Sequence, residues 1–160
     1  MLLSKTSEYA LQALIYLAAQ PPGEPVLSRE ISEYLRVPGQ YLAKILQELA
    51  KRGVLESYKG RGGGFVLRPG AEQMNILEVV EVVEGHPFGQ ECVLGLKACA
   101  DETACPVHYS WKPIKAQVID LLSRQTIGTM AEAVRGGQYR IYLPGGPELR
   151  LRPARDPASH

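Results

Sequence analysis

The feature that most constrains the fold is a succession of local patterns between residues 28 and 69. Ser28 is a good N-cap for a short helix ending near Leu35, and the VPG sequence that follows predicts a tight turn. A second helix is expected from about Gly39 to Arg52, because apolar side chains recur there at helical spacing: Tyr41, Leu42, Ile45, Leu46 and Leu49. The sequences VLESYK and FVLRP flank the turn GRGGG, which predicts a β-hairpin.

Another helix precedes this segment. Apolar residues recur at helical spacing from Ser4 to Ala19, and the PPGEP sequence at residues 21–25 ends the pattern. Helix, short helix, tight turn, helix and hairpin is the order of elements in a winged helix-turn-helix. We therefore predict a mainly α fold with a small β-wing, and a winged helix-turn-helix DNA-binding domain over residues 1–70.

The helix predicted from Gly39 to Arg52 presents side chains suited to DNA. Its apolar stripe leaves Gln40, Lys44 and Gln47 outward, and Gln and Lys are residue types that read base edges and hold phosphates. Lys59 and Arg61 lie on the hairpin tip, which suits a minor groove or the phosphate backbone. Each feature alone also fits a solvated surface, but their order and spacing together favour DNA binding. The expected DNA contacts are Ser28, Gly39, Gln40, Tyr41, Lys44, Gln47, Lys59, Arg61 and Gly62.

The distribution of charge permits this role. Residues 1–68 carry nine Lys or Arg and six Asp or Glu, whereas residues 69–135 carry five and nine. The modest positive excess of the first part permits contact with a polyanion. The GRGGG turn lacks the GK[ST] ending of a nucleotide-binding loop, and no nucleophile–base pair or paired carboxylates indicate a catalytic site. We expect that the chain is not an enzyme.

Residues 71–135 are predicted to hold a loop and a long dimerisation helix. Asn75 with Glu78 is a plausible capping box for a helix that Gly85 ends, and residues 86–105 show no period. A further helix is expected from Tyr109 to Gln125, with Pro113 in its first turn. Its apolar seam favours a partner helix in a second subunit over packing within the chain; this seam consists of Trp111, Ile114, Val118 and Leu121.

Two features follow the seam helix. Thr129 with Glu132 resembles a capping box for one last short helix. Beyond it, residues 136–160 form a tail in which the periodic pattern fades, and the last residues read as a disordered end.

All three cysteines lie in the predicted loop, and a histidine follows them. Cys92, Cys99, Cys105 and His108 have the spacing C-x6-C-x5-C-x2-H. Structural zinc sites generally use close pairs such as C-x2-C, whereas widely spaced thiolates suit an iron–sulfur cluster held from several sides. Spacing alone leaves three possibilities open, namely a cluster, a zinc ion and redox-active thiols.

The sequence also resembles the Rrf2 family of bacterial transcription regulators, from Met1 to about Val134. The resemblance is carried by LLSKTSEYALQALIYLA, by SREISEYLRVPGQYLAKILQELAKRGVLESYKGRGGGFVL, by NILEVVEVVEG and by the three-cysteine loop. It implies a homodimer whose long helices cross around residues 111–122, and a near-palindromic double-stranded DNA operator. It further implies an iron–sulfur cluster on Cys92, Cys99 and Cys105 whose state changes DNA affinity. The tail is not covered.

The resemblance supplies two candidates for the fourth ligand. His108 matches the histidine that completes a 2Fe–2S site in IscR-like members, and Glu8 matches the acidic residue that reaches the cluster from the partner subunit in NsrR-like members. We favour His108 and a 2Fe–2S cluster, because C-x2-H can close locally; a 4Fe–4S cluster is the alternative. Ala43 stands where IscR-like members carry a recognition-helix glutamate, so their choice of operator does not carry over.

We therefore predict a homodimeric DNA-binding regulator that senses redox state, nitric oxide or iron–sulfur status. The alternative is the same fold without a cluster, regulating through thiol oxidation, zinc or a protein partner. No segment has the pattern of a signal peptide, and no apolar stretch approaches the roughly 18 residues that a membrane span needs. We expect a cytoplasmic protein without membrane contact, in which reducing conditions keep thiols free.

Overall fold

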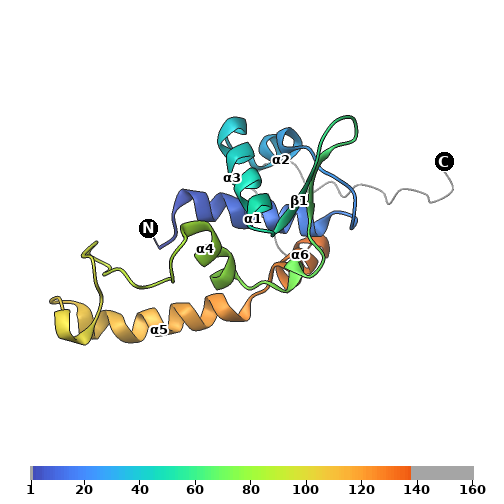
Figure 1. Ribbon diagram of the computed structural model, residues 1–160. Coiled ribbons are helices and arrows are strands. Elements are labelled where there is room, and N and C mark those ends of the chain that lie inside the picture. The colour runs from blue at the N-terminus through green and yellow to red at the C-terminus, as the bar shows by residue number, and fades with distance from the viewer. Residues whose placement is uncertain (1, 138–160) are drawn as a thin grey trace.

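The structure is a computed structural model that describes residues 2–137. Most of the predicted tail therefore lies outside the described residues. This described part of the chain is mainly helical with one two-stranded antiparallel sheet (Figure 1). Its elements are α1 (Lys5–Ala19), α2 (Ser28–Leu35), α3 (Gly39–Lys51), β1 (Leu55–Tyr58), β2 (Gly64–Leu67), η1 (Ala71–Gln73), α4 (Ile76–Glu84), η2 (Asp101–Thr103), α5 (His108–Arg124) and α6 (Ile127–Arg135).

Helix α1 is the centre of the packing. Ser4 caps it by accepting a hydrogen bond from the Ser7 backbone N–H at 3.1 Å. From Tyr9 onward most of its side chains are apolar, so the helix is buried on several sides. Elements α2, α3, α4, α6 and β2 all pack against it. The core joins residues on both sides of the predicted domain boundary near residue 70, among them Leu14, Leu46, Val79 and Ile127.

Helices α2 and α3 form the predicted helix-turn-helix. Arg36 ends α2 in the left-handed conformation with φ 56°, and the chain re-enters a helix at Gly39. The prediction that Ser28 is the N-cap of α2 is wrong by one residue: the cap is Leu27, which makes no side-chain cap bond. The reason is tertiary, because the preceding Val26 is paired with Phe65 of the wing and delivers the chain directly into the helix.

Strands β1 and β2 form the predicted wing, with Leu55 opposite Leu67 and Tyr58 opposite Gly64. Gly64 has φ 135°, and a Cβ there would lie 2.4 Å from the Val26 carbonyl oxygen. Only glycine permits this close approach, which lets Val26 and Phe65 exchange two backbone hydrogen bonds of 3.0 and 2.8 Å. The wing is therefore fastened to the connection between α1 and α2.

The N-termini of α4 and α6 lie side by side, and each has its own cap. Asn75 and Glu78 form the predicted capping box of α4. The box predicted from Thr129 and Glu132 is wrong, because Thr126 caps α6 and accepts a hydrogen bond from the Thr129 N–H at 3.1 Å. The two cap residues pair with each other in an antiparallel bridge, so backbone pairing between chain segments fixes where α6 begins.

Helix α5 lies along the side of the molecule opposite α2, α3 and the wing, and the cysteine loop folds at its N-terminal end (Figure 1). The helix begins at His108, one residue before the predicted start. Pro113 therefore lies in the second turn of α5 rather than in the first. In the second turn, proline leaves the carbonyl four residues earlier without its helical hydrogen bond. The remainder of the predicted fold, a mainly α chain with a small wing, is confirmed.

Candidate metal centre and nucleic-acid interface

The predicted DNA-contact residues lie on α3 and on the wing tip. Gln40, Lys44 and Gln47 are exposed on α3, and Lys59, Arg61 and Gly62 are exposed between the two strands. Gly39 is also exposed, and Ser28 is half-buried at the start of α2. The inward stripe of α3 is buried as predicted at Leu42, Ile45, Leu46 and Leu49. The hydrophobic pattern therefore orients the polar face of α3 outward.

Tyr41 was expected both in the apolar stripe and among the DNA contacts. Its side chain is 38% exposed, so its assignment to the buried stripe is wrong. The ring packs edge-on against Tyr9 at a centroid distance of 5.8 Å, and the hydroxyl shares a hydrogen bond with the Thr6 hydroxyl. Tyr41 thus rests on the start of α1 while part of its surface stays accessible.

The loop between α4 and α5 brings the four predicted ligands together as two pairs. The Sγ atoms of Cys92 and Cys105 are 3.3 Å apart, and Cys99 Sγ lies 3.6 Å from His108 Nδ1. Cys92 and His108 are only 5% and 3% exposed. All three thiols are free. Among the residues that the structure describes, no three His, Cys, Asp or Glu side chains gather as they would around a single metal ion.

An acidic residue that the sequence analysis missed orients the histidine. Asp101 Oδ1 lies 2.8 Å from His108 Nε2, and both Asp101 oxygens accept from Lys112 Nζ at 2.8 Å. The hydrogen bond from Lys112, with a smaller contribution from His108, holds the pKa of Asp101 below its usual value. A carboxylate seven residues before the histidine gives no signal in the sequence, because only the fold of the loop brings the two together.

Local hydrogen bonds also favour the thiolate of Cys92. Its Sγ accepts from the Leu94 backbone N–H at 3.4 Å and contacts Cys105. The bond from Leu94, followed by that from Cys105, lowers the pKa of the Cys92 thiol. Thiolate is the form that binds metals and attacks electrophiles, so this loop favours thiolate chemistry.

Two other candidates lie apart from this group. Glu8 is on α1, where its carboxylate binds Lys5 Nζ at 2.6 Å, and no hydrogen bond or ion pair within the described residues joins it to the cysteine loop. His86 is exposed, with Nδ1 3.2 Å from the Pro87 carbonyl oxygen. Within one chain the structure therefore groups His108, and not Glu8, with the three cysteines.

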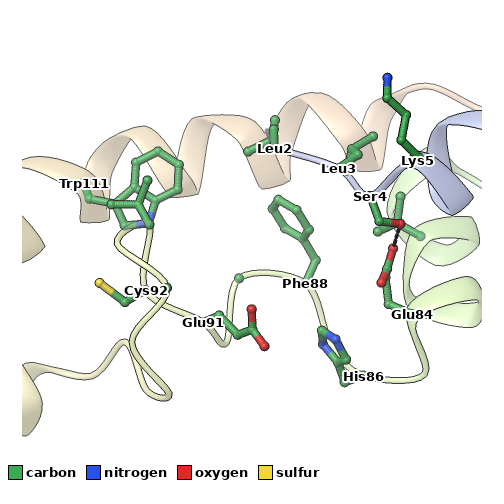
Figure 2. Close-up of a pocket in the computed structure, with 14 residues that line it drawn as sticks. Leu2, Leu3, Ser4, Lys5, Glu84, His86, Phe88, Glu91, Cys92 and Trp111 are labelled. Atoms are coloured by element: carbon green, nitrogen blue, oxygen red, sulfur yellow. Dashed lines mark hydrogen bonds between the residues drawn. The ribbon is translucent and has the colours of Figure 1, made fainter.

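A cavity of about 920 Å³ adjoins Cys92. Figure 2 shows its walls, which come from the N-terminal segment, the end of α4, the loop and Trp111 of α5. The Glu84 carboxylate at the end of α4 accepts hydrogen bonds from the Ser4 and Ser7 hydroxyls at the start of α1. Burial raises the pKa of Glu84, but these hydrogen bonds outweigh it and hold the pKa below its usual value.

The predicted seam of α5 is partly exposed in the single chain. Ile114 and Leu121 are 50% and 59% exposed, and Trp111 and Val118 are half-buried. Leu122, beside the seam, is buried. No helix in the described part of the chain is long and apolar enough to cross a membrane.

A winged helix-turn-helix with a polar third helix, followed by a cysteine loop and a long helix, defines a class of DNA-binding transcription regulators. The model of the Rrf2 family, described as "Iron-dependent Transcriptional regulator", matches residues 3–133. The chain belongs to this family, which confirms the resemblance seen in the sequence.

Individual relatives agree with this assignment. The chain is 35% identical over 129 residues to an HTH-type transcriptional regulator of Aquifex aeolicus, covering 79% of this chain and 89% of that protein. It is 30% identical over 128 residues to the HTH-type transcriptional regulator NsrR of Shouchella clausii, covering 79% and 86%. The fold is similar to that of CymR, the global cysteine regulator of B. subtilis, with a TM-score of 0.67, 22% identity and coverage of 82% and 97%.

Proposed function

We propose that this transcription regulator is a homodimer that controls DNA affinity through an iron–sulfur cluster bound by Cys92, Cys99, Cys105 and His108. The observation that carries the proposal is the grouping of these four side chains into two separate pairs in one loop. Three thiols and one imidazole are a donor set that iron–sulfur clusters accept. When bound, the cluster would supply a centre that responds to electrons, oxygen or nitric oxide.

The spacing within each pair fits the donor set. Two thiolates on one tetrahedral metal, each about 2.3 Å from it, lie about 3.8 Å apart, and a thiolate and an imidazole nitrogen lie about 3.6 Å apart. The observed separations are 3.3 Å for Cys92 with Cys105 and 3.6 Å for Cys99 with His108. Each pair thus has nearly the spacing of two ligands on one metal. Two separate pairs would hold a 2Fe–2S cluster better than a single zinc ion.

The orientation of His108 supports its role as the fourth ligand. Its Nδ1 faces Cys99, while Nε2 lies 2.8 Å from Asp101. A carboxylate that accepts the second ring N–H fixes the tautomer and orientation of a ligating histidine. In this proposal Asp101 holds His108 with Nδ1 free to ligate, and Lys112 neutralises the charge of the Asp101 carboxylate.

The surface of α5 supports the homodimer. Ile114 and Leu121 are large apolar side chains, and both are at least half exposed in the single chain. A second copy of α5 laid across them would remove this apolar area from water. Helix-turn-helix proteins that bind near-palindromic sites place one copy on each half-site, so the dimer also gives the operator its symmetry.

The order and packing of the elements connect the cysteine loop to the dimer helix and to the DNA-binding helix. The loop follows α4 and leads directly into α5, while α4 packs on α1 and α1 on α3. An ordered loop would fix the direction of α5 relative to this core, and hence the separation of the two α3 helices in the dimer. A coupling free energy of about 1–3 kcal/mol between the loop and the operator would change DNA affinity by about 5–150-fold.

The first test is anaerobic purification followed by a visible absorption spectrum and assays of iron and sulfide. We expect brown protein with about two iron and two sulfide per chain, as the 2Fe–2S stoichiometry requires. Cys99→Ala should lose the colour and alter operator affinity, whereas Lys97→Ala, an exposed change in the same loop, should do neither. Cys99→Ala protein with an intact cluster and unchanged DNA affinity would contradict the proposal.

The fourth ligand is tested by a second set of variants. His108→Ala should reduce the iron content and shift the absorption spectrum, and Glu8→Ala should leave both unchanged. Four iron and four sulfide per chain, with sensitivity to Glu8→Ala instead, would favour a 4Fe–4S cluster completed by the partner subunit.

The alternative is a regulator of the same fold that uses its thiols, zinc or a protein partner without a cluster. The contact between Cys92 and Cys105 also fits this alternative, because two thiols this close can be oxidised to a disulfide. Colourless protein after anaerobic purification, with stoichiometric zinc or with three titratable thiols, would support this alternative.

A further inference from the structure

The cysteine loop has a second chemical capacity that does not need a metal. The Cys92 and Cys105 sulfurs are 3.3 Å apart, the one thiol–thiol contact within the described residues. A disulfide bond is about 2.05 Å long, so the two atoms need to approach by only about 1.3 Å. Both residues lie between α4 and α5, where the single short η2 turn is the only helical element, so small backbone shifts can supply this movement.

The third cysteine is placed differently. Cys99 Sγ faces His108 Nδ1 at 3.6 Å, and that ring is held in turn by Asp101. His108 is 3% exposed and thus fixed by its surroundings. The loop therefore separates one close pair of thiols from one thiol paired with an imidazole.

We propose that the cluster-free protein forms a reversible disulfide between Cys92 and Cys105 on exposure to a peroxide, and that Cys99 remains a thiol. Cys105 is half-buried and Cys92 is 5% exposed, so hydrogen peroxide meets Cys105 first. The Cys105 thiol loses its proton as its sulfur attacks one peroxide oxygen, the O–O bond breaks, and the hydroxide that leaves takes up that proton to form water. The product is a sulfenic acid at Cys105.

Cys92 then resolves this sulfenic acid. Its sulfur already lies 3.3 Å from that of Cys105 and is held there by a hydrogen bond from the Leu94 N–H at 3.4 Å. Cys92 attacks the Cys105 sulfur, the S–O bond breaks, and the released hydroxide takes up a proton. In sum, two thiols lose two electrons and two protons to form one disulfide, and hydrogen peroxide is reduced to two waters.

The disulfide would have a consequence for cluster assembly. It withholds two of the three cysteine ligands, so the oxidised chain could not take up a cluster until a thiol reductant restored them. This consequence rests on the proposed function, whereas the disulfide itself does not.

The test uses the full chain, stripped of iron with a chelator, reduced and desalted under anaerobic conditions. After treatment with hydrogen peroxide, free thiols are alkylated and the protein is digested with trypsin without reduction. Arg68 and Lys112 each precede proline, where trypsin does not cut, so Cys92 falls on the peptide 62–97 and the other two cysteines fall on 98–115. A bond between Cys92 and Cys105 therefore joins the two peptides.

We expect the thiol count to fall from three to one per chain, and fragmentation to show alkylated Cys99 in the joined peptides. Cys99→Ser should retain the joined peptides and Cys105→Ser should lose them, with circular dichroism confirming that both variants are folded. A bond within 98–115, a bond between chains on a non-reducing gel, or three thiols after peroxide would overturn the proposal and leave the cluster proposal intact.

Dithiothreitol should restore three thiols, and iron–sulfur reconstitution should then succeed only after this reduction. Cluster uptake by the oxidised chain would overturn the assembly consequence alone.

Discussion

The helix-turn-helix region and the cysteine loop place their apolar side chains in opposite ways. In α1 to α3, Leu14, Ile31, Leu42 and Leu46 are all 0% exposed in one core. Between α4 and α5, Val93, Leu94 and Leu96 are 52%, 58% and 51% exposed. The first region buries these side chains in the core that it shares with α4 and α6, whereas the loop leaves comparable side chains in water.

The buried groups at the loop are a thiol and an imidazole rather than aliphatic side chains. Cys92 and His108 are almost inaccessible there, and Asp101 and Leu94 supply their hydrogen bonds. Burial of polar groups costs free energy unless partners are present, and these hydrogen bonds supply the partners. An apolar core therefore sets the shape of the first region, whereas hydrogen bonds around a thiol and an imidazole hold the loop.

A matched pair of leucines gives the strongest test of this difference in burial. Leu46→Ala removes a 0% exposed side chain from the core and should lower the free energy of unfolding by about 2–5 kcal/mol. Leu94→Ala removes the same atoms from a side chain that is 58% exposed, and should change it by less than about 0.5 kcal/mol. Equilibrium urea unfolding measures both, and an equal cost for the two would show that the loop has a core of its own.

The exposed seam of α5 gives the next largest effect. Ile114→Asp places a charge where the proposed dimer buries an apolar side chain, and should raise the dimer dissociation constant by about 100-fold, or about 2.7 kcal/mol. Ala116→Asp, an exposed position off the seam, is the matched control and should leave the constant unchanged. Sedimentation velocity over a range of concentrations makes the measurement. Dimers of equal stability in both variants would remove α5 from the interface.

Most elements of the fold could be predicted from the sequence because their signals are local. The stripe of α3, the Asn75 capping box and the glycine-rich wing each depend on residues within a few positions of one another. The failures at Ser28 and Thr129 share one cause. Each lies at a helix start where backbone pairing with a distant segment, at Val26 or at Thr126, decides the first residue.

The candidate metal centre likewise has one part that could be predicted from the sequence and one part that could not. The three cysteines and His108 could be predicted as one group, because their spacing within the loop is a sequence property. The pairing of Cys92 with Cys105 and of Cys99 with His108 could not, because it depends on how the loop folds back on itself. The role of Asp101 was missed for the same reason, since its partners His108 and Lys112 lie on the next helix.

The DNA-binding surface should show a smaller and more specific effect. Lys44 is exposed on α3 and Lys97 is exposed in the loop, so they carry the same charge in the two compared regions. Lys44→Ala should weaken operator binding about tenfold and reduce the slope of log affinity against log salt by about 0.9, the value for one lost phosphate contact. Lys97→Ala should change neither quantity in fluorescence anisotropy titrations at several salt concentrations. Equal slopes for both variants and the parent would place α3 away from the phosphates.

The smallest expected effect concerns the junction between the two regions, where Glu84 at the end of α4 accepts hydrogen bonds from Ser4 and Ser7 at the start of α1. These bonds hold its folded-state pKa below the unfolded value, so their contribution is present above about pH 4.3 and is lost as pH falls through the folded pKa. Glu84→Gln should therefore cost about 1 kcal/mol of unfolding free energy at pH 7, and progressively less as the pH is lowered below about 4.3. Glu91→Gln, the same change at an exposed loop residue, is the control and should leave the unfolding free energy at pH 7 unchanged. Parallel stability curves for Glu84→Gln and the parent across this range would mean that the carboxylate does not tie α4, and with it the loop, to α1.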